Sequence, residues 1–129
     1  MQEFTPDSPF ARHVRPSPNH DARALPADIL LLHYTGMTST AVAIDRLRDL
    51  SAKVSSHYVV DEHGKIFQLV PEALRAWHAG VSSWEGERDI NSRSIGIEIG
   101  NPGHSYDYPD FPEAQIERAS CRERVCLLV

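Results

Sequence analysis

The sequence predicts one domain of the α/β class, in which a helix covers a β-sheet. The run Ile-Leu-Leu-Leu-His-Tyr at residues 29–34 is apolar without alternation, which is typical of a strand buried on both faces. Directly after it, Thr38 or Ser39 can cap a helix that runs to about Leu50, with one apolar face formed by Ala43, Leu47 and Leu50. At 129 residues the chain is long enough for one such domain and too short for two.

A β-hairpin is predicted after the helix. Residues 57–60 and 65–70 are strand-like runs separated by the polar tetrad Asp-Glu-His-Gly, and Gly64 can take the positive φ that a hairpin turn needs. Residues 71–91 are rich in Gly, Ser, Trp and charge, without periodicity. We therefore expect a long loop there, and loops of that length in compact domains tend to be functional.

A further strand is predicted at residues 94–100, where isoleucines alternate with other residues. This alternation places Glu98 on the face opposite Ile97 and Ile99. From Phe111 onward the pattern indicates the first turn of a helix, because Pro and Glu occupy positions that first turns favour. The strands and helices therefore follow one another along the chain.

The two ends of the chain differ from its middle. Residues 1–27 hold five prolines, which favour an extended arm lying on the domain, since proline denies helix and breaks sheet ladders. Both cysteines, Cys121 and Cys126, fall within the last dozen residues. The rest of the chain therefore cannot be a disulfide scaffold.

Charge and hydropathy narrow the classes of function. A formal charge of -5 and a pI near 5.7 argue against a surface adapted to nucleic acid or anionic lipid. The start of the chain lacks the basic patch and apolar run of a secretory signal, and no apolar stretch approaches membrane-spanning length. We expect a monomeric cytoplasmic protein, or a periplasmic one if the true start lies upstream of Met1, without nucleic-acid or membrane partners.

Two polar side chains interrupt the apolar strands. His33 ends the first strand and is either a core-edge histidine bonded to a backbone carbonyl or a metal ligand or general base. Glu98 lies in the predicted strand at residues 94–100, where its face is either solvated or buried, and burial would raise its pKa into the range of a general base. On neighbouring strands, the two side chains could face one cleft.

The long loop carries a third candidate group. Trp77 and His78, followed by Ala and Gly, suit a binding wall that stacks on a sugar or a peptide, and local loop packing is the alternative. Of the other histidines, His57 begins a strand and is a spare ligand candidate.

Taken in order, the segments LLLHYTG, SSHYVVDEHGKIFQLV, RAWHAGVSSWEG and NSRSIGIEIGN resemble the zinc-dependent N-acetylmuramoyl-L-alanine amidases related to peptidoglycan-recognition proteins and phage lysozyme amidases. The resemblance runs from about Pro18 to Glu117, and AWHAG and SIGIE are most similar to the branch of bacterial anhydro-muropeptide amidases. It implies a mixed central β-sheet flanked by helices, here without its C-terminal part.

The resemblance also implies roles for particular residues. His33 would be the first zinc ligand, and Glu98 the general base acting on the metal-bound water. Trp77 and His78 would help to line the muropeptide groove, with Asn91 as a further candidate for substrate binding. A zinc ion with three protein ligands and an open position supplies the polarised carbonyl and the nucleophilic water that amide hydrolysis needs.

The sequence departs from this family after Glu117. The other two ligands, a His in a Gly-His-Ser-Asp-like turn and an Asp or Cys near a Lys-x-Asp-Pro-Gly-like segment, are absent, and so is the lysine expected to stabilise the oxyanion. Residues 118–125 instead resemble a translated sequencing adapter. We therefore expect a partial amidase domain at residues 28–117 and a non-native tail at 118–129, with a genuine divergent terminus as the alternative.

The parent protein is thus expected to hydrolyse the amide bond between N-acetylmuramic acid and L-alanine in peptidoglycan or muropeptide substrates. This chain, whose Zn²⁺ site is incomplete, is expected to be inactive. One alternative is a non-catalytic peptidoglycan-binding module, which the presence of Glu98 disfavours. Another is a different metal site formed by His33, His57 and His78.

Overall fold

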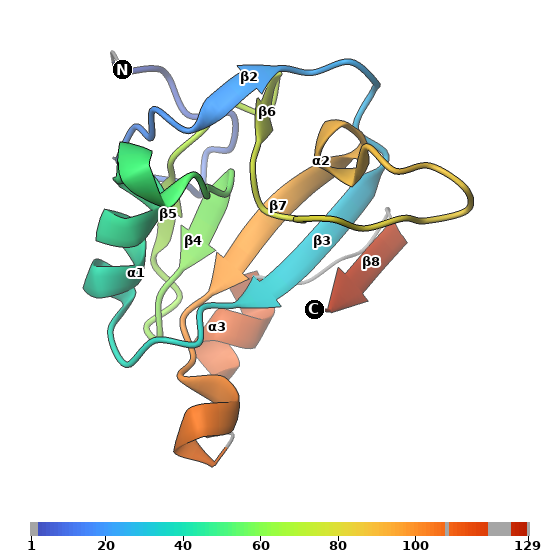
Figure 1. The fold of residues 1–129 in the computed structure, drawn as a ribbon. Helices are drawn as coiled ribbons and strands as arrows, with labels where there is room; N and C mark the ends of the chain where they lie inside the picture. Colours follow the sequence, from blue (N-terminus) through green and yellow to red (C-terminus); the bar gives the residue numbers. More distant parts are fainter. Residues whose placement is uncertain (1–2, 108, 119–124, 129) are drawn as a thin grey trace.

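The structure is a computed structural model and describes residues 3–107, 109–118 and 125–128. Figure 1 shows a central sheet with helices on it. The strands are β1 (His13–Val14), β2 (His20–Ala22), β3 (Ile29–Tyr34), β4 (Tyr58–Val60), β5 (Ile66–Gln68), β6 (Leu74–Ala76), β7 (Ser94–Ile99) and β8 (Val125–Leu128). The helices are α1 (Thr40–Arg48), α2 (Ile90–Arg93) and α3 (Glu113–Arg118).

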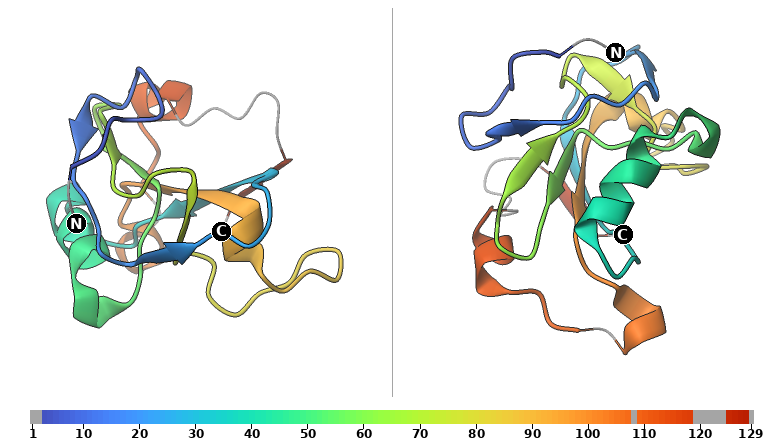
Figure 2. Two further views of the ribbon diagram at one scale, coloured as in Figure 1. Left: turned by 90° about the horizontal axis from the view of Figure 1, so that it is seen from above. Right: turned by 90° about the vertical axis from the view of Figure 1, so that its left-hand side faces the viewer.

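The central sheet is mixed, which confirms the predicted fold class. Among the described residues it has six strands in the order β1-β5-β4-β7-β3-β8, and β4 and β5 form its antiparallel pair while the other neighbours are parallel. The two views of Figure 2 agree that α1 lies on one face of this sheet and α3 on the other. In the described part of the chain, no helix is long and apolar enough to span a membrane.

Helix α1 begins where the sequence predicts and ends earlier. The Ser39 side chain caps it by accepting a hydrogen bond from the backbone N–H of Val42, and Ala43 and Leu47 are buried as expected. The prediction for Leu50 is wrong, because the chain leaves the helix after Arg48 and Leu50, now in a separate 3₁₀ turn, is 65% exposed. The sheet-facing side of the helix is therefore short.

The hairpin prediction is confirmed. β4 and β5 pair antiparallel, and Gly64 between them has a φ of 79°. The Asp61 carboxylate accepts hydrogen bonds from the backbone N–H groups of His63 and Lys65, which closes the turn. An added Cβ at Gly64 would lie 2.7 Å from the carbonyl oxygen of Ala114, so this glycine also lets α3 approach the hairpin.

Strand β7 alternates between two environments. Ile95 and Ile97 pack in an apolar cluster with Tyr58 and Leu30 on one face of the sheet. On the other face, Glu98 lines a cavity beneath α1. The predicted alternation of the isoleucines against Glu98 is therefore confirmed.

The N-terminal arm, residues 1–27, contains two short strands that pair with later parts of the chain. β1 pairs with β5, and β2 pairs with β6 in a separate two-stranded sheet. The prediction of one loop over residues 71–91 is wrong for β6 and for α2. β6 is only three residues long, and it becomes a strand because a segment more than fifty residues earlier pairs with it, a contact that no local pattern reveals.

The C-terminal part begins as predicted and then passes partly outside the described residues. Helix α3 follows Pro112, and Gln115, fully buried, donates hydrogen bonds to the carbonyls of Val60 and Gly100. Of the tail predicted to be non-native, residues 119–124 and 129 lie outside the described residues. The remainder includes β8, which pairs with β3. The non-native origin of the tail stays a prediction.

Candidate functional site

His33 and Glu98 lie next to each other on parallel strands. They are register partners in the pairing of β3 with β7. Partners in register point to the same face of a sheet, and for this pair it is the face that α1 covers. The structure thus brings together the two candidates that the sequence could place only on separate strands.

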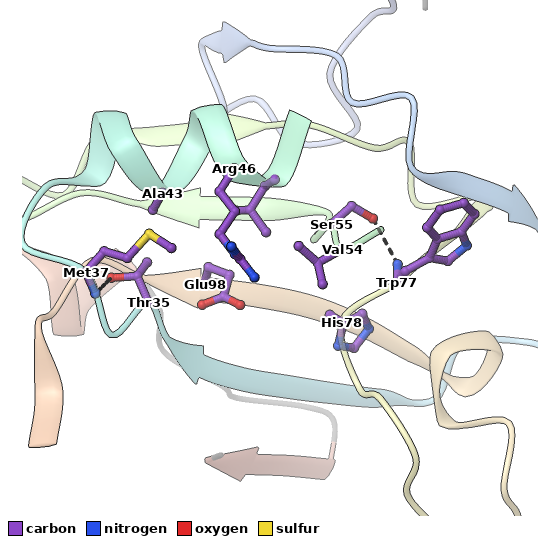
Figure 3. Close-up of a pocket in the computed structure, with 10 residues that line it drawn as sticks. Thr35, Met37, Ala43, Arg46, Val54, Ser55, Trp77, His78 and Glu98 are labelled. Carbon is purple, nitrogen blue, oxygen red and sulfur yellow. Dashed lines mark hydrogen bonds between the residues drawn. The ribbon is translucent and has the colours of Figure 1, made fainter. Parts of the chain in front are cut away.

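A cavity of about 160 Å³ lies between α1, β7 and the segment that follows β6. Figure 3 shows Glu98 at its floor, with Arg46 reaching in from α1 and His78 at one end. The half-buried Trp77 also lines the cavity. Its lining is completed by Thr35, Met37, Ala43, Leu47, Val54 and Ser55.

The Glu98 carboxylate is buried with part of its hydrogen-bonding capacity unused. Its Oε2 atom has no hydrogen-bond partner among the described residues. Burial raises the pKa of Glu98 from 4.5 to about 7. Since this value lies near neutral pH, the carboxyl group can both accept and release a proton under physiological conditions.

The His33 imidazole is hydrogen-bonded to His78 and is neutral. The Nε2 atom of His33 lies 3.0 Å from Nδ1 of His78, and only 9% of the His33 surface is exposed. Burial lowers the pKa of His33 to about 4, and burial is also the main cause that lowers the pKa of His78. A neutral imidazole is the form that can bind a metal ion.

His57 uses both ring nitrogens for structure. Its Nδ1 accepts a hydrogen bond from the backbone N–H of Gly96 at 3.0 Å. Its Nε2 therefore carries the proton and donates to the carbonyl of Leu74 at 2.9 Å. With neither nitrogen free, His57 does not fit the alternative metal site with His33 and His78. Across the described residues, no group of three or more His, Cys, Asp and Glu side chains could hold a metal ion.

Asn91 acts on the loop that carries the site. Its Oδ1 accepts hydrogen bonds from the backbone N–H groups of His78 and Ala79, at 3.0 and 2.8 Å. Asn91 lies in α2, which the Asp89 side chain caps. The side chain thus orients the loop at His78, and it does not line the cavity.

Sequence reasoning missed two side chains of the candidate site. Arg46 lines the cavity, and its place three residues after the buried Ala43 and next to the buried Leu47 was a signal that could have found it. Ser94 lies 3.0 Å from Nε2 of His78. Its even spacing from Glu98 along β7 puts both on one face, which the sequence also contained.

Gly96 makes room for the His78 ring. A Cβ added at Gly96 would lie 2.4 Å from Cγ of His78. We expect Gly96→Ala to displace the ring and to lower the free energy of unfolding by about 1–3 kcal/mol, the usual cost of overpacking. Thermal and urea unfolding measure the loss.

A second substitution isolates the cause. In a His78→Ala background the ring is gone, so Gly96→Ala should cost nothing there or should stabilise the strand. Equal losses in the two backgrounds would show that the strand itself, and not the ring, requires glycine.

The chain is similar to known cell-wall amidases. Residues 23–122 match the family described as N-acetylmuramoyl-L-alanine amidase. The chain is 44% identical over 104 residues to N-acetylmuramoyl-L-alanine amidase AmiD of Escherichia coli (strain K12), a match covering 69% of this chain and 36% of that protein. It thus spans about a third of the length of this curated relative.

Solved structures of amidases are also similar to this chain. A selenomethionine derivative of AmpD superposes with a TM-score of 0.74 at 28% identity, covering 92% of this chain and 74% of that one. AmiD from E. coli, in complex with the substrate anhydro-N-acetylmuramic acid-L-Ala-D-gamma-Glu-L-Lys, superposes with a TM-score of 0.64 at 36% identity, covering 76% of this chain and 42% of that one.

Proposed function

Because this chain belongs to the N-acetylmuramoyl-L-alanine amidase family, we propose that its domain carries the general base of a zinc-dependent amidase. The reaction is hydrolysis of the amide bond between N-acetylmuramic acid and L-alanine in peptidoglycan fragments. Glu98 carries the proposal. Its carboxylate faces a cavity, has an unpartnered oxygen and has a pKa raised to about 7, the properties of a group that transfers protons at neutral pH.

Glu98 would act first as a general base and then as a general acid. As a carboxylate it would take a proton from the attacking water, and as a carboxylic acid it would return that proton to the leaving amine. A pKa of about 7 lets both forms exist near neutral pH.

Zinc is the metal that we propose for the whole protein, where it would polarise the scissile carbonyl and activate water. His33 fits as one ligand, since it is neutral. The described residues do not fit a complete site, because they hold no group of three or more possible ligands. We therefore expect the 129-residue chain by itself to release no peptide from muropeptides.

A muropeptide is the proposed ligand of the cavity. The relative AmiD was solved with such a substrate, and its match covers most of this chain. Trp77 offers a flat apolar ring for a sugar or peptide. Arg46 offers a cation that can pair with a peptide carboxylate.

Binding to the purified chain tests this assignment. We expect N-acetylmuramoyl-L-alanyl-γ-D-glutamate to bind. Trp77→Ala should raise its dissociation constant roughly tenfold, the usual effect of losing an aromatic contact. Isothermal titration calorimetry measures both. Trp84→Ala is the matched control, since Trp84 lies in the same loop and does not line the cavity. No binding, or equal weakening by both substitutions, would count against the proposed groove.

The second candidate is a peptidoglycan-binding module without catalysis. The absence of a complete metal group among the described residues favours it. In that case binding would survive both chelation and Glu98→Gln, and a longer product of the same locus would bind without hydrolysis. Zinc-dependent release of peptide that Glu98→Gln abolishes would exclude the module.

A further inference from the structure

A chain of hydrogen bonds runs from the backbone into His33. The Ser94 hydroxyl lies 2.6 Å from the carbonyl oxygen of Ile90 and therefore donates to it. Its single proton is then used, so the contact of 3.0 Å with Nε2 of His78 must be a hydrogen bond that His78 donates. Ser94 thus sets which nitrogen of His78 carries the proton.

The same reasoning extends to His33. With its proton on Nε2, a neutral His78 has a lone pair on Nδ1, and this atom lies 3.0 Å from Nε2 of His33. His33 must therefore donate from Nε2. The reverse direction would need a His78 imidazolium, a cation buried without a bonded carboxylate, which is costly.

Several contacts hold the His78 ring in this position. Gly96 leaves the space for the ring on β7, because a Cβ there would lie 2.4 Å from it. The backbone N–H of His78 donates to Asn91. The rings of His33 and His78 meet edge to face, at 79° between their planes. The backbone and the ring of His78 are therefore both fixed by the surrounding fold.

We propose that His78 and Ser94 are positioning residues, which fix His33 as the tautomer protonated on Nε2 and leave its Nδ1 lone pair as the donor atom. Among the described residues, no hydrogen bond is made to Nδ1 of His33. A histidine that binds a metal through one nitrogen is usually oriented by a hydrogen bond at the other. That Nδ1 serves a zinc ion rests on the proposed function, whereas the tautomer does not.

This inference changes the role expected for His78. Both of its ring nitrogens are engaged inside the protein. The ring can still form part of the cavity wall, but it keeps no nitrogen for a hydrogen bond to a substrate. His78 therefore acts through His33, and Trp77 remains the loop side chain available for ligand contact.

Nuclear magnetic resonance of the metal-free 129-residue chain, labelled with ¹⁵N at histidine, tests the proposal at pH 7. We expect protected Nε2–H protons on His33 and His78, and a scalar coupling across the hydrogen bond from His33 Nε2 to His78 Nδ1. A proton on Nδ1 of His33 would overturn the proposal. The wild-type spectrum decides this point without any variant.

Matched serine variants test the positioning. Ser94→Ala removes the acceptor of His78, and we expect the Nε2–H proton of His33 to exchange with water roughly tenfold faster, in line with a lost hydrogen bond. Ser92→Ala is the control, because Ser92 is equally buried and its hydroxyl instead accepts from the backbone N–H of Ala24. Equal exchange rates in the two variants would refute a positioning role.

Zinc chloride separates this inference from the proposed function. On titration we expect the Nδ1 signal of His33 to shift and that of His57 to stay, since His57 has no free nitrogen. The tautomer and the serine variants are measured without zinc, so the positioning inference stands or falls independently of the zinc assignment.

Discussion

Replacing Arg23 with methionine is expected to lower the free energy of unfolding by roughly 3–5 kcal/mol, because several partly buried backbone carbonyls lose their donor at about 1 kcal/mol each. The guanidinium donates to five backbone carbonyls, those of Glu72, Leu74, Asn91, Ser92 and Ser94. These carbonyls belong to the β6 region, α2 and the start of β7. Methionine fills similar space and leaves the carbonyls without a donor.

Chemical denaturation of the wild type and the variant measures this loss. Arg93→Met is the matched control, because the Arg93 guanidinium also donates hydrogen bonds, but both go to the exposed carboxylate of Asp28. We expect a much smaller loss there, since exposed ion pairs stabilise little. A similar loss for the two variants would mean that the carbonyl cluster does not depend on Arg23. The hydrogen bonds of Arg23 also bear on the candidate site, because Ser92 and Ser94 lie where α2 passes into β7, the strand that carries Glu98.

Replacing Glu98 with glutamine is expected to stabilise the fold at high pH and to leave it unchanged at low pH. Burial raises the pKa of Glu98 from 4.5 to about 7 in the folded chain, so the folded state holds this proton more tightly than the unfolded state. The stability that this proton confers is fully present below pH 4.5 and is lost as the pH rises to about 7. The loss is roughly 3 kcal/mol, at 1.36 kcal/mol per pKa unit.

Glutamine does not ionise, so the variant escapes this loss. Denaturant unfolding at pH 4 and pH 8 should show nearly equal stabilities for wild type and variant at pH 4, and a variant more stable by roughly 3 kcal/mol at pH 8. The same substitution at the exposed Glu3 provides the control for the loss of one charge. A difference that is constant over this pH range would contradict the burial of the carboxylate. If Glu98→Gln stabilises the fold, the carboxylic acid at this position would serve function and not stability.

Local patterns in the sequence predicted the elements that carry the site. The unbroken apolar run of β3, the alternating isoleucines of β7 and the spacing of Ala43 and Leu47 in α1 each depend on a periodicity that neighbouring residues reveal. His33 and Glu98 stood out for the same reason, as polar side chains inside apolar strands. Only the pairing of the strands could show that these two residues are neighbours.

Contacts between distant segments decided the rest. β6 exists because β2 pairs with it, and no pattern within three residues predicts such a partner. The direction of the His78 ring depends on the absence of a side chain at Gly96 and on the hydroxyl of Ser94, both on another strand. The sequence by itself thus determined which residue types were candidates and on which faces they lie. The tertiary structure decided which of them meet and which proton each one carries, because packing and hydrogen-bond partners are set by residues far apart in the chain.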